Sequence, residues 1–342
     1  MRSPPRCRPT SGVRGWRPRP RRDLWADDSG ARLGPQRYGL GEMAAGGAQA
    51  RGHRGRGLAV SGVESGTRAR EALDSAITAI AAAGCETPRL DAELLIAHVL
   101  GVARERLLSD PDLAVSGPAV RALRDAVRRR AVQREPVAYI TGTRHFRRLE
   151  LAVDHRVLIP RPETELLVEL AVAALPRGAR VLDVGTGSGA VALALADERP
   201  DLTITGSDLS DDALAVARAN AARLGLDRVQ WLHADLLEGV PGVFDAILSN
   251  SPYVAESDRA SLAPEILRHE PAGALFAGPD GLDVIRPLVA QAGARASVCL
   301  LAVEIGAGQA GAVAELMRAA GFAAVRAERD LAGIERVVVG SR

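Results

Sequence analysis

The chain has 342 residues, 47% hydrophobic and 25% charged, so most of it can bury a core. Its net charge of +2 is unevenly spread: residues 1–60 carry 13 Arg against four acidic residues, leaving 31 of the 44 basic and 38 of the 42 acidic residues to the rest. The net-acidic body argues against a general binder of phosphate backbones. The sequence has no apolar run of the ~18–20 residues that a membrane span needs. Its three cysteines are widely spaced and predict no metal site.

Residues 1–64 are rich in Arg, Gly and Pro and show no hydrophobic periodicity. Such a composition buries too little apolar surface to offset the entropy of ordering the backbone. We expect a disordered extension here.

A small helical bundle is predicted over residues 65–143. "AREALDSAITAIAAAG" has apolar residues at helical spacing and ends at Gly84, and "DAELLIAHVLG" repeats this design and ends at Gly101. A third helix is expected after Ser116-Gly117-Pro118. No group of catalytic side chains falls in this region, which favours a docking or substrate-recognition module.

A β-hairpin connector is predicted over residues 144–159. The segment "HFRRLELAVDHRVLI" alternates apolar and polar residues around Asp154-His155, which is typical of two strands joined by a turn.

Residues 160–342 alternate strands and helices. The expected strands are "ARVLDVG", "LTITGSD", "VQWLHAD", "FDAILSN", "SVCLLAVEIG", "AAVRAER" and "ERVVVG", with helices at 189–198, 211–224, 281–294 and 309–320. This order predicts a doubly wound α/β domain with a seven-stranded, largely parallel sheet. Ligands of such sheets bind beyond the carboxyl ends of the strands, so the loops after Val184, Ser207 and Ser249 are the expected sites.

A glycine-rich loop follows the first strand. It runs from Gly185 through Thr186, Gly187 and Ser188 to Gly189, and its glycines let the backbone approach a ligand where a Cβ would clash. The spacing also satisfies the dinucleotide pattern GxGxxG/A. Asp183, two residues before the first glycine, favours S-adenosylmethionine, because its carboxylate can organise the loop or face the ammonium of that cofactor.

Acidic residues end the next two strands. Asp208 follows Gly185 by 23 residues, where a carboxylate can accept hydrogen bonds from both ribose hydroxyls of either kind of cofactor. Its other reading is a cap of the following helix, a role better given to Ser210. Asp235 and Leu236 end the third strand and are expected to hold the edge and face of an adenine.

The fourth strand ends in "SNSPYV", where we expect the acceptor site. Methylation of an amide nitrogen requires a nitrogen held in line with the methyl group and N–H bonds that are polarised. The side-chain oxygen of Asn250 and the carbonyl of Ser251 can each accept one hydrogen, and the ring of Tyr253 can stack on the planar group. Pro252 restricts the residue before it to extended angles.

From about residue 66 to 342 the chain resembles the HemK/PrmC family, the glutamine N5-methyltransferases of peptide chain release factors. The resemblance is carried in order by "PVAYITG" (136–142), "LIPRPETE" (158–165), "LDVGTGSGAVALALA" (182–196), Asp208, "SNSPYV" and "GPDGLDVI" (278–285). It implies a class I S-adenosylmethionine-dependent methyltransferase fold with an N-terminal helical bundle and a β-hairpin linker.

The resemblance further implies which residues act. Residues 185–189, Asp208 and Leu236 would contact S-adenosylmethionine, together with Asn250. Residues 250–253 would hold the glutamine of the Gly-Gly-Gln loop of a release factor, and the bundle would dock the body of that factor. A cytoplasmic, monomeric enzyme with no stable nucleic-acid or membrane partner is expected.

One departure from the family pattern concerns Ser251, which stands where the family has the first proline of Asn-Pro-Pro-Tyr. The carbonyl is retained, but the fixed φ of a proline ring is lost, at about 0.4–1 kcal/mol of preorganisation. We expect reduced but retained activity.

Three alternatives stay open on the sequence. An amino-methyltransferase for adenine in DNA or RNA would share the Asn-x-Pro-Tyr site but should carry a basic groove. A factor-binding homologue could have little or no turnover because of Ser251. An NAD-dependent oxidoreductase would fit the glycine loop but lacks a recognisable acid for hydride transfer.

Overall fold

Helices build the first part of the chain that the computed structural model describes, residues 66–342. They are α1 (Ala69–Ala82), α2 (Pro88–Leu100), α3 (Arg104–Ser109), α4 (Pro118–Ala131) and α5 (Val137–Thr141). Ile80, Leu95 and Ile96 lie at the centre of their shared core. The expected helices are present, whereas the short α3 and α5 were not predicted, because five or six residues give no readable period. The extension expected over residues 1–64 lies outside the described residues.

Two short pairs of strands accompany these helices. β1 (Thr67–Arg68) pairs with β2 (Ala114–Val115), and β3 (Thr143–Phe146) pairs with β4 (Leu149–Ala152), both antiparallel. The second pair is the expected hairpin, but its turn was wrongly placed at Asp154-His155.

The observed turn of this hairpin lies at Arg147 and Arg148 and is held by tertiary contacts. The backbone N–H of Arg147 donates to Glu165 at 3.0 Å, and its guanidinium pairs with Glu198 at 2.8 Å. Asp154 instead closes a local turn by accepting from the backbone N–H of Arg156 at 3.0 Å. The alternation of apolar and polar residues does not show which of two polar turns forms the hairpin, because the observed turn is held by carboxylates from distant parts of the chain.

A seven-stranded sheet forms the rest of the described chain. Its strands stand in the order β10-β11-β9-β8-β5-β6-β7, with β11 antiparallel to both of its neighbours. The strands are β5 (Arg180–Val184), β6 (Thr203–Asp208), β7 (Gln230–His233), β8 (Ala246–Ser249), β9 (Leu300–Glu304), β10 (Ala324–Arg329) and β11 (Glu335–Ser341). The expected doubly wound α/β fold is confirmed.

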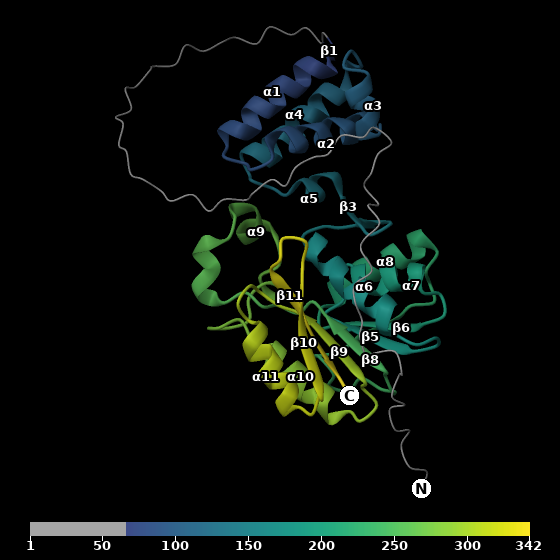
Figure 1. The fold of residues 1–342 in the computed structure, drawn as a ribbon. Coiled ribbons are helices and arrows are strands. Elements are labelled where there is room, and N and C mark those ends of the chain that lie inside the picture. Colours follow the sequence, from purple (N-terminus) through teal and green to yellow (C-terminus); the bar gives the residue numbers. More distant parts are fainter. Residues whose placement is uncertain (1–65) are drawn as a thin grey trace. The chain divides into compact units, whose positions relative to one another are not determined.

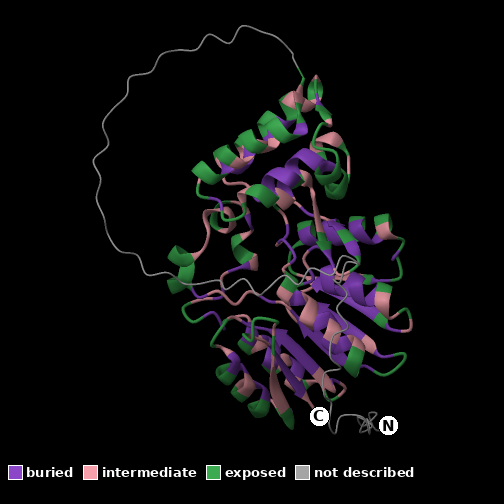
Figure 2. Ribbon diagram, turned by 45° about the horizontal axis from the view of Figure 1, so that its top comes forward, coloured by how far each residue is buried: buried purple, intermediate pink, exposed green. Residues whose placement is uncertain are grey.

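Helices cover both faces of this sheet (Figure 1). One face packs against α6 (Glu165–Ala174), α7 (Ala190–Glu198) and α8 (Asp211–Leu224), and the other against α10 (Ile285–Ala294) and α11 (Ala310–Ala319). Because side chains alternate along a strand, Val181 packs into the first layer and its neighbour Leu182 into the second. The inner strands β5, β6, β8, β9 and β11 are accordingly buried on both sides, whereas the edge strands β7 and β10 have no fully buried residue (Figure 2).

Short elements flank the carboxyl edge of the sheet. η1 (Pro162–Thr164) precedes α6, whereas η2 (Glu256–Ser261), α9 (Pro264–His269) and η3 (Ala272–Ala274) follow β8. These segments carry the walls of the site described below. Within residues 66–342, no helix has both the length and the apolarity needed to span a bilayer.

Candidate active site

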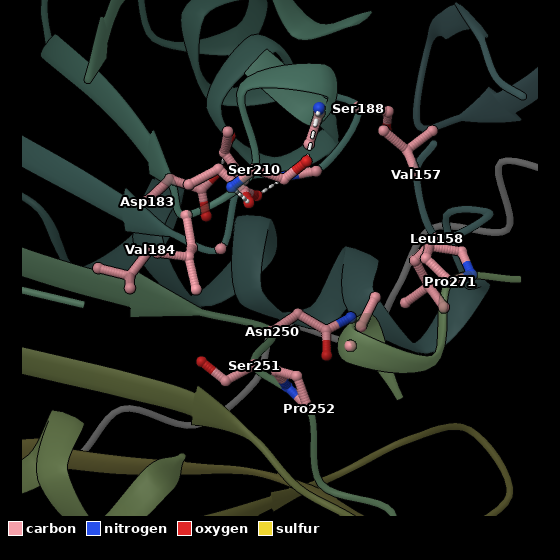
Figure 3. A pocket seen from close by; sticks show the side chains of 18 of the residues that line it. Val157, Leu158, Asp183, Val184, Ser188, Ser210, Asn250, Ser251, Pro252 and Pro271 are labelled. Carbon is pink, nitrogen blue, oxygen red and sulfur yellow. Dashed lines mark hydrogen bonds between the residues drawn. The ribbon is translucent and has the colours of Figure 1, made fainter. Parts of the chain in front are cut away.

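A pocket of about 480 Å³ opens at the carboxyl ends of β5, β6 and β8 (Figure 3). The sheet order changes direction here, because β6 and β8 lie on opposite sides of β5. The volume is that of a small-molecule site. Side chains from the loops after these three strands therefore meet around one cavity.

The glycine-rich loop forms one wall. Gly185 and Gly187 have φ values of 70° and 55°, which a residue with a Cβ rarely adopts. The Gly185 and Thr186 N–H groups donate to the carbonyl of Ser207, each at 2.9 Å, which ties the loop to β6. The loop thereby turns its backbone to the cavity.

Asp183 organises this loop from below. Its Oδ2 accepts from the Thr186 hydroxyl at 2.6 Å and from the Ala192 N–H at 3.2 Å. Burial raises the pKa of Asp183 to about 6, against the lowering effect of these two hydrogen bonds and with a further rise from the neighbouring Asp208. Of the two roles weighed for Asp183, the organisation of the loop is confirmed.

Asp208 lies across the loop and has two backbone partners. Its two carboxylate oxygens accept from the N–H groups of Gly187 and Ser210, each at 2.9 Å. Its pKa is raised, mainly because of burial. Ser210 caps α8 by accepting from the Ala213 N–H at 3.2 Å, as the sequence suggested. Because Ser210 supplies the cap of α8, Asp208 is not needed for that role, and it lines the cavity.

The turn after β8 forms the opposite wall and is tethered at each residue. The Ser249 hydroxyl donates to the Val184 carbonyl at 2.8 Å and pairs with the Ser251 hydroxyl. The side-chain Nδ2 of Asn250 donates to the Thr164 hydroxyl at 2.9 Å. Figure 3 shows Asn250 at the middle of the pocket, with Val157, Leu158 and Pro271 to one side and Asp183 and Val184 to the other.

Tyr253 is held from behind. Its carbonyl accepts from Nε2 of Gln309 at 3.0 Å, and its hydroxyl donates to Glu304 at 3.4 Å. Gly281 packs so closely that a Cβ there would lie 2.2 Å from the Tyr253 carbonyl oxygen. The loop 278–285 therefore supports the acceptor turn.

Most of the residues predicted to act line this pocket: Gly185, Thr186, Gly187, Ser188, Asp208, Asp235, Leu236, Asn250, Ser251 and Pro252. Gly189 and Tyr253 lie outside the lining. Gly189 instead precedes α7 with a φ of 85°, and Tyr253 packs against the core behind the sheet.

Sequence reasoning missed the outer wall of the pocket. It comes from two distant segments, Arg156 to Thr164 on one side and Pro271 to Ala274 on the other. Glu270 joins them, since it accepts from Arg161 at 2.6 Å and from the Ile159 N–H at 3.3 Å. "LIPRPETE" stood out in the sequence only through the family resemblance, because its role depends on tertiary contacts.

The residues around the glycine loop fit S-adenosylmethionine. That cofactor carries a positive sulfonium and a positive ammonium, and Asp183 and Asp208 are two acidic groups whose pKa values are raised by burial. A cation placed between them favours their ionised forms. The apolar remainder of the lining, such as Val184 and Leu236, suits an adenosine moiety.

A parallel sheet with this strand order and a ligand pocket at its switch point is the architecture of class I methyltransferases, and the chain is a methyltransferase of that class. Residues 71–142 match the PrmC N-terminal domain family, and residues 162–278 match the methyltransferase small domain family.

Curated relatives identify the family. A release factor glutamine methyltransferase of Rhodospirillum rubrum is 42% identical over 294 residues, which cover 85% of this chain and 90% of the relative. Those of Deinococcus radiodurans and Mycolicibacterium smegmatis are 43% and 47% identical, covering 80% and 66% of this chain and 98% and 80% of the relatives. The chain belongs to the release factor glutamine methyltransferase family.

Proposed function

We propose that this chain transfers a methyl group from S-adenosylmethionine to the side-chain nitrogen, N5, of the glutamine in the Gly-Gly-Gln loop of peptide chain release factors. The observation that carries the proposal is the Asn250 amide, held at the middle of the pocket by Thr164 and across from the glycine loop. Family membership supports the same substrate.

S-adenosylmethionine, when bound, supplies a methyl group activated by the sulfonium. The glycine loop, Asp208, Asp235 and Leu236 bind it, with Asp208 accepting from the ribose hydroxyls. Asp183 keeps the loop in shape and adds negative charge beneath it. These residues bind the cofactor and accept no proton during the methyl transfer.

Asn250 and Ser251 orient the acceptor. An amide nitrogen is a weak nucleophile because its lone pair is delocalised into the carbonyl. The Asn250 side-chain oxygen and the Ser251 carbonyl each accept one of its N–H groups, which fixes the nitrogen and raises its electron density. Pro252 keeps the turn extended, and Tyr253, held against the core by Gln309 and Glu304, fixes the far end of the turn. The proton leaves after transfer, so no general base is required.

The outer wall suits a loop of small residues. Pro160 on one side and Pro271, Gly273 and Ala274 on the other leave apolar surfaces with few polar groups at the entrance. A glutamine flanked by glycines can pass such an entrance with no side chain beside it. We propose in addition that the bundle over residues 65–143 docks the body of the release factor, and that the reaction takes place in the cytoplasm.

The test is incubation with labelled S-adenosylmethionine and purified release factor. Label should appear on the release factor, should be absent from a Gln→Ala variant of its Gly-Gly-Gln loop, and should fall about 100-fold or more with Asn250→Ala. Duplex DNA and RNA serve as parallel acceptors. Label on the Gln→Ala factor would overturn the proposal by showing another acceptor site, and label on nucleic acid alone would overturn it in favour of the adenine amino-methyltransferase.

A further inference from the structure

A fully buried asparagine lies within α8. Asn220 is 0% exposed and lies outside the lining of the pocket. Asparagine is a poor helix former, and a buried amide costs free energy unless its polar atoms are hydrogen-bonded. The presence of an asparagine at this position therefore directs attention to the bonds that its side chain makes outside the helix.

The Asn220 amide joins two segments that are far apart in the sequence. Its Oδ1 accepts from the backbone N–H of Ala152 at 2.7 Å, and its Nδ2 donates to the Ala152 carbonyl at 3.0 Å. Nδ2 also donates to the Ser188 carbonyl at 3.0 Å. Ala152 ends β4 of the connector, whereas Ser188 belongs to the glycine-rich loop and lines the pocket. One side chain thus holds the connector and the cofactor loop together.

Asn220 takes the place of a neighbouring strand beside β4. The N–H of Val153 donates to the Gly142 carbonyl at 3.0 Å, on the β3 side of the hairpin. Successive residues of a strand direct their backbone groups to opposite sides, so the N–H and carbonyl of Ala152 face away from β3. The Asn220 amide pairs with both groups, as a strand would. Without this amide, the edge of β4 would lose both hydrogen bonds.

The neighbours of Asn220 fix the direction of its amide. Arg223, one turn later in α8, reaches Oδ1 at 3.5 Å, so the oxygen faces two donors while the NH2 group faces two carbonyls. A reversed amide would place oxygen against oxygen and N–H against N–H. Aspartate, which has the same size, only accepts when ionised, and leucine does neither. The arrangement is therefore specific for an amide.

The chain that follows β4 becomes part of the outer wall of the pocket. Val153 and Val157 pack against Ala213 and Val216, which lie on the same face of α8 as Asn220. From there the chain runs on to η1, which holds the acceptor turn through its last residue. One face of α8 therefore supports both the cofactor loop and the outer wall.

We propose that Asn220 is a positioning residue that fixes the spacing between the glycine-rich loop, which binds the cofactor, and the outer wall, which borders the acceptor. The inference rests on the function proposed above. Methyl transfer requires the sulfonium methyl and the acceptor nitrogen to lie in line and close together, so a shift of either wall costs rate. Asn220 acts from outside the pocket, through the Ser188 carbonyl and the edge of β4.

The first test is calorimetry with S-adenosylmethionine on wild type, Asn220→Leu and Asn220→Ala. Leucine keeps the volume and leaves the Ser188 carbonyl without its donor, so the affinity should fall about tenfold. Alanine leaves room for a water that can replace part of the bonding, so the affinity should fall about threefold. Wild-type affinity in folded Asn220→Leu, or in Asn220→Ala where the leucine variant does not fold, would overturn the inference.

The matched control separates positioning from stability. Val289→Ala removes buried methyl groups from α10, on the other face of the sheet, and should lower stability without touching either wall. A loss of stability lowers the folded fraction but leaves the affinity of the folded protein unchanged. Binding of S-adenosylmethionine by Val289→Ala should therefore match wild type. An equal loss of affinity in this control and in the Asn220 variants would refute the positioning role.

The second test measures methylation of the release factor at saturating S-adenosylmethionine. Saturation refills the cofactor site but does not restore the spacing to the outer wall, so kcat of Asn220→Leu, per folded molecule, should stay about tenfold below wild type. Val289→Ala should have the wild-type kcat. Full recovery of kcat in Asn220→Leu would confine Asn220 to cofactor binding and overturn the proposed spacing.

A readout without any substrate separates this inference from the proposed function. The backbone N–H of Ala152 should exchange slowly with solvent in wild type and fast in Asn220→Leu, as followed by NMR. If wild type binds S-adenosylmethionine but does not methylate the release factor, while exchange and cofactor affinity change as expected, the proposed function fails and the role of Asn220 in holding the two walls stands. Fast exchange in wild type would remove the basis for that role.

Discussion

At the scale of single residues, Asp183 makes cofactor binding sensitive to pH. Its carboxyl is 2% exposed and its pKa is about 6, so a large fraction is protonated at mildly acidic pH. A cationic ligand binds better to the ionised site, and affinity for S-adenosylmethionine should therefore weaken about tenfold between pH 7 and pH 5. Calorimetry should show this trend, with a smaller trend for the uncharged thioether S-adenosylhomocysteine and a smaller one for Asp183→Asn, which keeps only Asp208. A flat wild-type profile would mean that Asp183 does not sense the cofactor charge.

The loss of a proline ring at position 251 is partly compensated by a hydrogen bond of the Ser251 hydroxyl, which the sequence did not reveal. Its hydroxyl pairs with that of Ser249, which in turn donates to the Val184 carbonyl of β5, so the turn is tethered to the neighbouring strand. The flexibility expected from the loss of a proline is partly restored by this pair.

Variants at position 251 should rank Pro, then Ser, then Ala in kcat/KM for the release factor. Proline fixes φ and should raise activity about twofold to fivefold, equivalent to about 0.4–1 kcal/mol. Alanine removes the tether, and activity should fall by a similar factor. The ranking is checked by steady-state kinetics at saturating S-adenosylmethionine. Identical values for Ser251→Ala and wild type would leave the hydroxyl pair without a role in the turn.

The sequence predicted the residues of the site that follow strands and carry distinctive chemistry. Gly185, Asp208 and Asn250 could be found because their residue types are unusual at strand ends. Thr164 could not, because a threonine in a polar loop is ordinary and its partner, Asn250, lies 86 residues further along the chain. Hydrogen-bond direction among buried groups is a property of the packed structure.

At the scale of elements, a buried ionic cluster joins α4 to α9. Glu265 accepts from Arg130 at 2.8 Å and from Arg134 at 2.7 Å, and Arg130 also pairs with Asp91 at 2.6 Å. These side chains are 7–15% exposed, so solvent screens them little. The pKa of Glu265 is lowered by the two arginines despite its burial. The cluster therefore fixes the short α9, whose hydrophobic contacts are few, against the bundle.

Removal of Glu265 should be strongly destabilising, since it leaves two buried guanidinium groups with an incomplete set of partners. We expect Glu265→Ala to lower the unfolding free energy by about 3 kcal/mol. The matched control is Glu256→Ala, which breaks the Arg259 pair whose side chains are about half exposed and should cost less than about 1 kcal/mol. Urea unfolding followed by circular dichroism measures both. Equal effects of the two variants would show that burial of the cluster adds nothing.

Element order was predictable, but turn positions were less so. Helix 211–224 follows from a period of 3.6, and the inner strands follow from short apolar runs bounded by polar residues and glycine, both of which the local sequence carries. The hairpin turn at Arg147 was missed because Glu165 and Glu198, which hold it, come later in the chain. Contacts between elements determine where such turns form, and hydrophobic periodicity carries no information about these contacts.

At the scale of the whole molecule, the sheet accommodates a buried acid, Glu304, whose ionised form opposes folding. Glu304 has an ordinary pKa of 4.5 and a folded pKa of about 7, so the folded chain holds this proton more tightly than the unfolded chain. Its contribution to stability is fully present below pH 4.5 and is lost as the pH rises through 7. The ionised form of Glu304 is thus the form that the fold tolerates least.

This pH dependence can be measured as a change in the stability difference between wild type and Glu304→Gln. The difference in unfolding free energy, wild type minus variant, should fall by about 3 kcal/mol between pH 4.5 and pH 8, because 2.5 pH units at 1.36 kcal/mol each separate the two pKa values. The change with pH is the decisive quantity, since a buried glutamine has hydrogen-bonding costs of its own that do not vary with pH. Urea unfolding at four or five pH values provides it, with Glu315→Gln as the exposed control. A difference that stays constant over this range would mean that Glu304 has the same pKa in the folded and the unfolded chain, and that its burial does not disfavour the ionised form.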